Sequence, residues 1–387
     1  MNITRDNIST PVFLVRETAL RRNLELIADV QRRAGVKIIM AFKANALWRT
    51  FDILREYGVG CTASSLNELQ LGLEFLTDAV HSYTPAYTPA TIGRFLAGSS
   101  HITFNSLGQW RQFAGDVALW NAAHPGRRVS AGLRVNPRCS VVETDLYNPA
   151  LPGSRFGEHA EALAGGLPDG LEGLHFHALC EGSADDLRRV LEAFEAQFGD
   201  VLRSGRVRWV NMGGGHLMTR EGYDVDGLVD LLLGFRSRYP GVEVILEPGS
   251  AFTWRTGDLL TSVVDIMEND GVRTAIIDAS FACHMPDTLE MPYKPAITEA
   301  VEPAAGLPEY RLGGNSCLSG DFMGPWSFAA ELRPGQRLTL EDMNHYTTVK
   351  TTMFNGLQHP DIALERADGS IELLRRFTYD DYRSRMS

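Results

Sequence analysis

Short strand-like runs alternate with helical segments between residues 38 and 246. Eight runs rich in apolar and β-branched residues lie at Ile38–Phe42, Gly58–Cys61, Val80–Tyr83, Ile102–Phe104, Ser130–Val135, Gly173–His177, Val207–Met212 and Val242–Leu246. One intervening helix is clearly marked, because Ser183 and Asp186 have capping-box spacing and Leu187, Val190, Leu191, Phe194 and Phe198 share its apolar face. The pattern predicts an α/β fold, a (β/α)8 TIM barrel, with a doubly wound open sheet as the alternative.

The pattern changes after residue 257. Strand-like stretches follow without long helices between them, at Leu259–Ile266, Thr274–Asp278, Tyr310–Gly313, Arg337–Glu341 and Tyr346–Val349. Arg333–Gln336 and Ala367–Ser370 resemble hairpin turns, and Pro11–Val15 is a further strand that can join this part. We therefore predict two domains, a barrel over residues 20–257 and a mainly antiparallel β-barrel domain made of residues 1–19 and 258–387.

Composition narrows the class of partner. The formal net charge of −11 argues against nucleic acid, because phosphate binding needs clustered Lys and Arg. No apolar run approaches the ~20 residues that span a bilayer, and the N-terminal sequence lacks a signal-peptide pattern, so we expect no membrane partner. The five cysteines are scattered, without zinc-type or disulfide spacing, which predicts a cytoplasmic protein.

Lys43 ends the first apolar run, Val36–Phe42, and small polar residues follow it at once. A lysine at the C-terminal end of a buried strand is held in a partly dry site. Desolvation there lowers the ammonium pKa and frees the amine to form a Schiff base. Since many lysines at strand ends are solvated or ion-paired, the assignment depends on the rest of the chain.

Three glycines, Gly213, Gly214 and Gly215, follow the seventh predicted strand. Bare backbone N–H groups in such a loop can bind an anionic phosphate. The alternative is an ordinary tight turn, although three consecutive glycines exceed what a turn needs. No Lys-Ser/Thr pair follows them, so a nucleotide P-loop is not expected.

His175 and His177 lie two residues apart on a predicted strand and therefore on the same face. They could form a metal pair, stack on a flat aromatic cofactor, or be hydrogen-bonded core residues. The metal interpretation requires further ligands at later strand ends. Glu247 and Asp278 are available but no matching histidine is evident, so we place metal last.

Two later segments carry reactive side chains. Glu247 ends the eighth strand and could hold a proton on a pyridine nitrogen, or form a salt bridge instead. The polar loop Gly313–Asp321 contains one thiol, Cys317, and one carboxylate, Asp321. By itself such a cysteine is usually structural.

Taken in chain order, these features resemble the pyridoxal-phosphate decarboxylases of the alanine racemase-like fold, also called fold type III. The resemblance rests on Lys43, His177, Gly213–Gly215, Glu247, Cys317 and Asp321, and it runs from Pro11–Val15 to Tyr346. Within that family, three segments resemble the branch that decarboxylates carboxynorspermidine and carboxyspermidine. They are Leu174–Glu181, Cys283–Tyr293 and Glu341–Thr347.

The resemblance implies pyridoxal 5'-phosphate as the cofactor. Lys43 would form the internal aldimine, His177 would stack on the ring, and Glu247 would pair with the pyridine nitrogen. Gly213–Gly215 would hold the phosphate, with a further hydrogen bond from Tyr346. A carboxylate that keeps the ring protonated makes the ring a strong electron sink for the carbanion left by decarboxylation.

The same resemblance implies the substrate residues. Cys317 would reprotonate the α-carbon, and Asp321 would line the pocket, both acting in the partner's site of a homodimer. Asp278 and Asp287 stand at positions where the resemblance implies contact with the amines of the substrate. Ser250 stands where many relatives have an arginine on the phosphate and the carboxynorspermidine branch has glutamate, which puts the phosphate anchoring and the preferred polyamine in question.

We therefore expect an enzyme that decarboxylates carboxynorspermidine or carboxyspermidine, small cationic carboxypolyamines, to norspermidine or spermidine in polyamine biosynthesis. Three alternatives remain open. One is a pyridoxal-phosphate decarboxylase of another diamino acid, such as diaminopimelate. The second is a metal-dependent barrel hydrolase that uses His175 and His177. The third is a non-catalytic relative, which the presence of Lys43, Glu247 and Cys317 disfavours.

Overall fold

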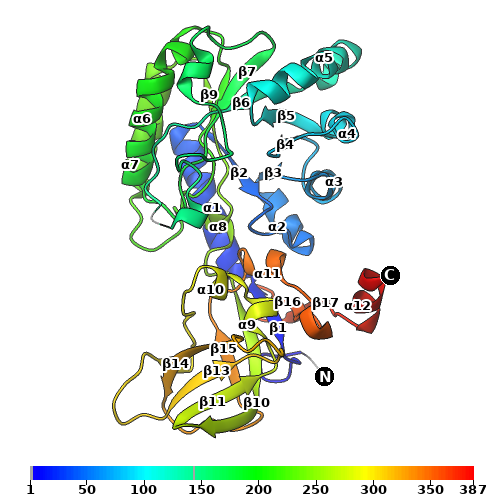
Figure 1. Cartoon of the computed structure of the whole chain (residues 1–387), viewed down its shortest axis with the longest axis vertical. Coiled ribbons are helices and arrows are strands. Elements are labelled where there is room, and N and C mark those ends of the chain that lie inside the picture. Colours follow the sequence, from blue (N-terminus) through cyan, green and yellow to red (C-terminus); the bar gives the residue numbers. More distant parts are fainter. Residues whose placement is uncertain (1–2, 143) are drawn as a thin grey trace. The chain divides into compact units, whose positions relative to one another are not determined.

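A computed structural model describes residues 3–142 and 144–387 (Figure 1). The chain forms two compact units, Asn23–Phe252 and a second unit of Met1–Arg22 with Thr253–Ser387. Each unit has its own sheet, so we describe the two in turn.

The unit Asn23–Phe252 is built on a closed barrel of eight parallel strands, in chain order around the ring. The strands are β2 (Lys37–Ala41), β3 (Gly60–Ala63), β4 (Val80–Tyr83), β5 (Ser99–Phe104), β6 (Ser130–Arg134), β7 (Leu171–His175), β8 (Trp209–Asn211) and β9 (Glu243–Leu246). Pairing of β2 with β9 closes the ring. The predicted (β/α)8 barrel is confirmed, and the doubly wound alternative is wrong because an open sheet has no such closing pair.

Helices lie before and between most of the barrel strands and cover the barrel (Figure 1). They are α1 (Glu17–Ala34), α2 (Phe51–Glu56), α3 (Leu66–Phe75), α4 (Ile92–Gly98), α5 (Leu107–Ala123), α6 (Ala184–Arg203), α7 (Val225–Arg238) and α8 (Ser250–Thr253). Short 3₁₀ turns occur at Trp48–Thr50, Pro125–Arg127, Asp145–Tyr147 and Ala160–Leu163.

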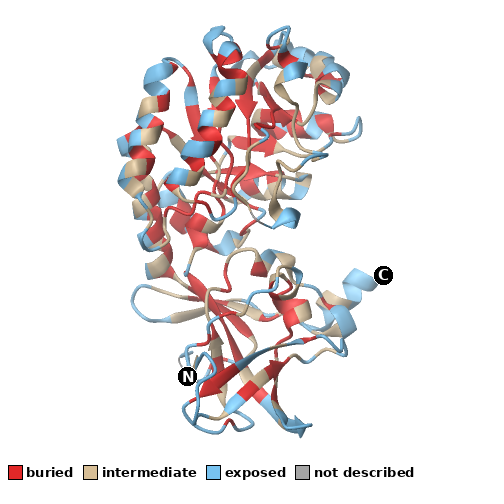
Figure 2. Cartoon of the chain, turned by 60° about the vertical axis from the view of Figure 1, so that its left-hand side comes forward, coloured by how far each residue is buried: buried red, intermediate tan, exposed pale blue. Residues whose placement is uncertain are grey.

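Helix α6 shows how the sequence sets this layer. The Ser183 and Asp186 side chains each accept a hydrogen bond from the other residue's backbone N–H, which completes the predicted capping box. The predicted apolar face is buried from Leu187 to Phe198. Figure 2 shows the same division for the other helices, whose outward faces are exposed while the barrel strands are buried.

The second unit is a nine-stranded mixed sheet in the order β12-β14-β13-β11-β10-β1-β16-β17, with β15 paired to β10. Its strands are β1 (Val12–Arg16), β10 (Gly257–Asn269), β11 (Val272–Ile277), β12 (Ala300–Val301), β13 (Glu309–Gly313), β14 (Phe322–Phe328), β15 (Arg337–Leu340), β16 (Asp361–Glu365) and β17 (Ile371–Arg375). The β1–β16 and β11–β13 pairs are parallel, and the other pairings among the described strands are antiparallel. Strand β1 joins this sheet, as the sequence predicted.

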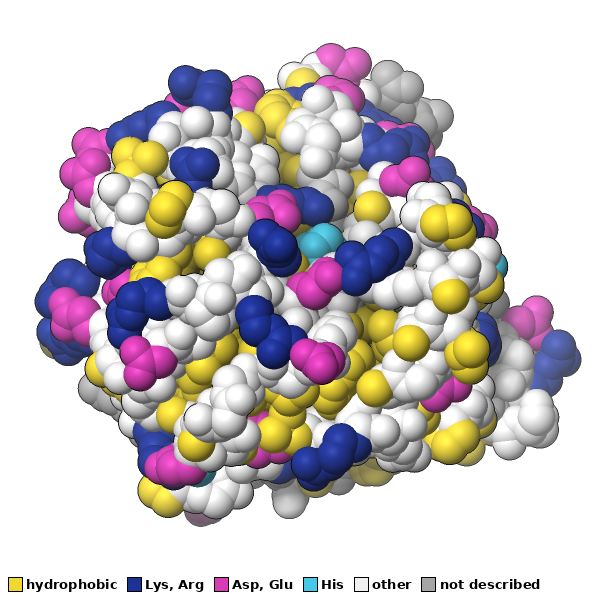
Figure 3. All heavy atoms as spheres, turned by 90° about the horizontal axis from the view of Figure 1, so that it is seen from above, with side chains coloured by type: hydrophobic (Ala, Val, Ile, Leu, Met, Phe, Trp, Pro, Cys, Tyr) yellow, Lys and Arg dark blue, Asp and Glu magenta, His cyan; other side chains and the backbone are white. Residues whose placement is uncertain are grey.

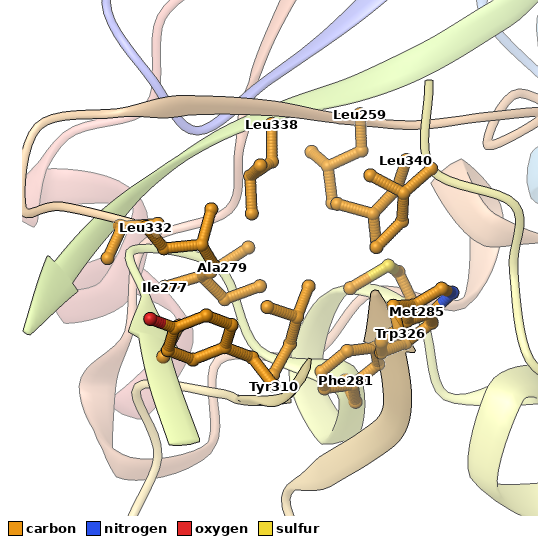
Figure 4. Close-up of a cluster of buried hydrophobic side chains, with 14 of the residues drawn as sticks. Leu259, Ile277, Ala279, Phe281, Met285, Tyr310, Trp326, Leu332, Leu338 and Leu340 are labelled. Carbon is orange, nitrogen blue, oxygen red and sulfur yellow. The ribbon is translucent and has the colours of Figure 1, made fainter. Parts of the chain in front are cut away.

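Short helices connect the strands of this unit, at α9 (Phe281–His284), α10 (Asp287–Glu290), α11 (Thr347–Lys350) and α12 (Tyr379–Met386), with a 3₁₀ turn at Phe354–Gly356. Its core is a cluster of buried apolar side chains (Figure 4). Leu259, Leu338 and Leu340 lie on one side of this cluster, and Tyr310 and Trp326 lie on the other (Figure 4). Burial of these large side chains stabilises this unit.

Two local predictions in this unit were wrong. Tyr346–Val349 is not a strand, because Tyr346 adopts a φ of 55° and the chain then turns into α11. Arg333–Gln336 is a turn but not a hairpin, since the strands on either side of it pair elsewhere, β14 with β12 and β13, and β15 with β10. The other predicted turn, Ala367–Ser370, does join two paired strands, β16 and β17.

The remaining bulk features concern thiols, membranes and charge. All five cysteines are free. Among the described residues, no helix combines the length and the apolar character needed to cross a membrane. On the face drawn in Figure 3, basic side chains are interspersed with acidic ones.

Candidate functional site

A cavity of about 300 Å³ lies at the carboxyl ends of the barrel strands, wholly within the barrel unit. Its lining comprises Ala41, Lys43, Thr62, Ser64, Tyr83, Pro85, Arg134, Leu146, Tyr147, Asn148, Pro149, Phe156, His175, His177 and Glu247. Three predicted site residues, Lys43, His177 and Glu247, thus come together although they are far apart in the sequence. The carboxyl end is where TIM-barrel enzymes place their active sites.

Lys43 directly follows β2 and its neighbour Phe42. The side chain is open to solvent from the cavity, but the barrel surrounds it closely. Burial, aided by the positive charge of Arg134, lowers the pKa of its ammonium group, and the Glu247 carboxylate opposes this only in part. A lysine in this state loses its proton more readily and is a better nucleophile than a solvated one.

The Glu247 carboxylate follows β9 and is held on both oxygens. Asn211 Nδ2 donates to Oε2 at 2.9 Å, and His175 Nε2 lies 3.1 Å from Oε1. Burial alone would raise the pKa of this carboxyl, but His175, Asn211 and Lys43 outweigh it and lower the pKa to about 2. The cavity therefore presents a fixed negative charge.

His177 is oriented by the glycine loop. Its Nδ1 accepts a hydrogen bond from the Gly214 N–H at 3.0 Å, so the neutral ring carries its proton on Nε2. Burial lowers the pKa of this imidazole well below its ordinary value, with Lys43 and Arg134 adding to the effect. The ring is therefore neutral and fixed at the cavity wall.

The three glycines are required by packing. A Cβ on Gly214 would lie 2.6 Å from the Glu247 carbonyl oxygen, and one on Gly213, where φ is +72°, would lie 2.4 Å from that of Phe176. The prediction of bare N–H groups is wrong for two of them, because Gly213 donates to Asn211 Oδ1 and Gly214 donates to His177. Among the described residues, the Gly215 N–H has no acceptor.

Sequence reasoning missed Arg134, which ends β6 as a buried, 4% exposed side chain. Its guanidinium lies 4.8 Å from the Tyr83 ring and 4.3 Å from the Phe156 ring, and it donates to the His177 carbonyl at 3.5 Å. No carboxylate of the described residues pairs with it, and burial lowers its pKa. Arg134, like Lys43, lies near the end of a predicted strand. This position was the signal in the sequence that could have identified it as a site residue.

Asp278 and Asp321 lie in the sheet unit, where local donors surround both. Asp278 accepts hydrogen bonds from the Thr10 and Thr261 hydroxyls and the Ser262 N–H at 2.5–2.9 Å. Asp321 accepts from three donors at 2.8–3.2 Å, namely Ser280 Oγ, Ala282 N and Ser316 N. Through these hydrogen bonds each carboxylate stabilises the conformation of the surrounding segments.

The other predicted residues differ in their surroundings. Asp287 forms an ion pair with Lys350 in the sheet unit. Cys317 is exposed, and its N–H donates to Asn355 Oδ1 at 2.6 Å. Tyr346 is half-buried in the same unit, whereas Ser250 begins α8 in the barrel unit.

The geometry gives no support to a metal centre at His175 and His177. His175 Nε2 faces Glu247, and His177 Nδ1 is occupied by the Gly214 N–H. Over residues 3–142 and 144–387, no group of three or more His, Cys, Asp or Glu side chains is arranged to hold an ion. The two imidazoles act instead on protein groups at the cavity.

Comparison with known proteins identifies the family. A family model described as "Pyridoxal-dependent decarboxylase, C-terminal sheet domain" matches residues 28–344. The chain belongs to the pyridoxal-dependent decarboxylases. This decarboxylase is 45% identical over 380 residues to carboxyaminopropylagmatine decarboxylase of Synechocystis, with 98% of this chain and 96% of the relative covered.

Two further comparisons concern Campylobacter jejuni. The decarboxylase is 40% identical over 388 residues to the carboxynorspermidine/carboxyspermidine decarboxylase of that organism, covering 97% of this chain and 98% of the relative. The crystal structure of carboxynorspermidine decarboxylase complexed with norspermidine from C. jejuni matches with a TM-score of 0.87 at 39% identity, covering 98% and 100% of the two chains. Diaminopimelate decarboxylase of Helicobacter pylori shares the fold, with a TM-score of 0.79 at 18% identity over 98% of each chain.

Membership of this family makes the protein a carboxy-lyase that uses pyridoxal 5'-phosphate. The cavity fits that group. It offers an amine of lowered pKa at Lys43, a carboxylate at Glu247, a neutral ring at His177 and a buried cation at Arg134. The amine of Lys43 matches the aldehyde of the cofactor, and the Glu247 carboxylate matches a protonated ring nitrogen. The His177 ring matches the flat aromatic face of the cofactor, and Arg134 matches an anionic oxygen.

Proposed function

We propose that this decarboxylase converts carboxynorspermidine and carboxyspermidine to norspermidine and spermidine in polyamine biosynthesis. The observation that carries the proposal is the full-length match to a structure complexed with norspermidine, with a TM-score of 0.87 at 39% identity. Another relative with this named activity, from Herminiimonas arsenicoxydans, is 38% identical over 98% of this chain. The diaminopimelate decarboxylases are much more distant, at 24% identity or less.

Pyridoxal phosphate supplies the electron sink that stabilises the carbanion left when carbon dioxide departs. In our proposal Lys43 attaches the cofactor through its amine, whose lowered pKa favours the neutral form. Glu247 would keep a proton on the ring nitrogen, and the neutral His177 ring would lie against the cofactor. Among Gly213–Gly215, we assign the phosphate contact to the Gly215 N–H, since the other two N–H groups already have acceptors, and Tyr346 adds a hydrogen bond.

For the substrate, we propose that Cys317 returns a proton to the α-carbon and that Asp278, Asp287, Asp321 and Ser250 contact the polyamine. Carboxylates suit a substrate with several ammonium groups. The exposed position of Cys317 supports its action in the cavity of a second copy of the chain. We therefore propose a cytoplasmic homodimer with shared sites.

The homodimer has a direct test. Lys43→Ala and Cys317→Ala are inactive alone if each removes a required group. Mixing the two variants regains up to about a quarter of the wild-type rate when subunits exchange at random and Cys317 acts in trans. Mixtures that remain inactive, despite subunit exchange measured by mass, contradict the shared site.

The substrate is tested with a panel on the cofactor-loaded enzyme. Carboxynorspermidine, carboxyspermidine, carboxyaminopropylagmatine and diaminopimelate are compared by kcat/KM, with carbon dioxide and the product amines both measured. The proposal expects the two carboxypolyamines to be turned over and diaminopimelate to be at least a hundredfold poorer, because a short diacid leaves the amine contacts unmade. Preference for diaminopimelate would contradict it.

A second candidate substrate is carboxyaminopropylagmatine, which the 45% identity to the Synechocystis enzyme favours. This compound ends in a guanidinium, which is planar and presents a fork of N–H donors, whereas an ammonium is a compact charge. The same panel distinguishes the two, since a site shaped for one end group loses hydrogen bonds with the other.

A further inference from the structure

His175 is a fully buried imidazole for which neither the family resemblance nor the proposed reaction provides a role. It ends β7 and is 1% exposed. Its ring meets the Tyr83 ring edge-on, with 5.4 Å between the centroids. Nδ1 has no hydrogen-bond partner in the described part of the chain, and Nε2 approaches Glu247 without full hydrogen-bond alignment. A buried polar ring left in this state costs free energy, so it requires an explanation.

The approach to Glu247 determines where the ring proton lies. Nε2 and Oε1 are 3.1 Å apart. Burial lowers the pKa of His175, so the ring is neutral and carries one proton. Two lone pairs at this distance would repel each other, so the proton lies on Nε2, the nitrogen nearest the carboxylate. Nδ1 is then the bare nitrogen, and Glu247 keeps its negative charge.

Glu247 is thus held from both sides. His175 faces Oε1, and Asn211 donates to Oε2 at 2.9 Å. Asn211 is itself fixed, because its Oδ1 accepts the Gly213 N–H at 2.8 Å. Each carboxylate oxygen has a second lone pair, and the carboxylate lines the cavity. The carboxylate can therefore accept one more hydrogen bond from a group in the cavity without giving up its present contacts.

We infer that His175 is a positioning residue, which aims the Glu247 carboxylate at the cofactor ring nitrogen and keeps it ionised so that the proton stays on the ring. The inference rests on the proposed role of Glu247. Besides His175 and Asn211, the charged or titratable groups that act on Glu247 are Lys43, Arg134, Tyr83 and His216. The cations among them are shared by every variant below, so they do not account for a difference between variants.

The test uses three substitutions that differ in where a donor stands. His175→Gln places an amide N–H near the position of Nε2, His175→Asn places one nearer Nδ1, and His175→Leu removes the donor. Each full-length variant is loaded with pyridoxal phosphate labelled with ¹⁵N in the ring, and the ring-nitrogen chemical shift reports its protonation. Thermal unfolding of each variant reports whether the fold is kept.

In the wild type we expect a protonated ring nitrogen across neutral pH. In His175→Leu and His175→Asn the resonance moves toward the unprotonated position, and kcat falls roughly tenfold with KM changed less than about twofold, because the N–H that faces the charged carboxylate is lost. His175→Gln restores both readouts. A replacement that merely disturbed packing would lower thermal stability without moving the nitrogen resonance.

The inference is overturned if His175→Leu keeps the wild-type resonance, or if Asn restores protonation as well as Gln. If His175→Leu does not fold, the Gln and Asn pair decides by itself.

His101→Phe is a matched control, because this barrel imidazole stacks on His81, with 4.1 Å between centroids, and Phe keeps the stack. Its resonance should equal that of the wild type. Failure of the wild-type protein to bind the cofactor at all would overturn the proposed function as well.

Discussion

The N–H of Gly214 donates a 3.0 Å hydrogen bond to Nδ1 of His177. Gly214 belongs to the loop after β8, and His177 belongs to the loop after β7. The backbone of the loop after β8 therefore sets the tautomer and the angle of a ring in the loop after the preceding strand, β7. A Cβ at Gly214 would also meet the Glu247 carbonyl after β9, so three consecutive strand ends depend on one small residue.

Gly214→Ala should weaken cofactor binding and the fold together. The added methyl lies 2.6 Å from the Glu247 carbonyl oxygen, and the backbone must move to accept it, at a cost of about 2 kcal/mol in the free energy of unfolding. Chemical denaturation and cofactor titration measure the two effects. Gly115→Ala in α5 is the matched control, since its Cβ meets no atom within 4 Å, and it should stabilise by about 0.5–1 kcal/mol. Equal behaviour of the two variants would contradict the packing argument.

Lys43 should make the stability of the cofactor-free protein depend on pH. Burial lowers its pKa in the folded state below the ordinary value of 10.5. Between these two values the unfolded chain binds more protons than the folded chain, so the contribution of Lys43 rises with increasing pH. The difference in unfolding free energy between wild type and Lys43→Met should therefore grow in favour of the wild type as pH rises toward 10.5. A constant difference would show that the folded-state pKa is not lowered.

Lys43→Met should also lack the visible absorbance of the bound cofactor.

Glu247→Gln should leave the fold intact but reduce turnover. Glutamine keeps the shape and can still bond to Asn211, but it has no charge with which to hold a proton on the ring nitrogen. We expect kcat to fall roughly a hundredfold, within the range for losing a positioned acid–base group. Because the pKa of Glu247 is about 2, the wild-type rate should show no titration of this group near neutral pH. Wild-type turnover by the Gln variant would remove the carboxylate from the mechanism.

Arg134→Met should shift stability and cofactor affinity in opposite directions. Removing a buried cation without a carboxylate partner relieves a desolvation cost, so the cofactor-free protein should gain about 1–2 kcal/mol. The cavity then lacks a positive charge for an anionic oxygen of the cofactor, and the dissociation constant should rise about tenfold or more. Arg134→Lys keeps the charge and serves as the control. Unfolding of the cofactor-free variant measures the change in stability, and a cofactor titration measures the change in dissociation constant. A loss of stability with unchanged cofactor affinity would contradict the role proposed for Arg134.

The barrel could be predicted because its strands are short apolar runs, most of which are followed by a helix. The sheet unit was harder. Strands β12, β14, β16 and β17 were not predicted, and β14 shows why. It contains Pro325 and Gly324, with a φ of +118° at the glycine, so its sequence does not alternate as a regular strand does. The strand forms because its partner β13 and the buried Trp326 fix it, and that information is not local.

For the site, the residues at strand ends were predictable and their environment was not. Lys43 and Glu247 follow predicted strands, His177 ends one, and the three meet at one cavity. The importance of Arg134 depends on the rings of Tyr83 and Phe156, which come from other parts of the chain. The domain boundaries and the roles of Tyr346, Cys317 and the aspartates stay predictions.

The pairing of β1 has a consequence for how the protein is made. This strand leaves the ribosome before the other described strands, yet its two neighbours in the sheet, β10 and β16, begin only at residues 257 and 361. All eight barrel strands are synthesised in between. During translation one edge of β1 must therefore wait for β10, and the other edge must wait until β16, at Asp361–Glu365, has emerged.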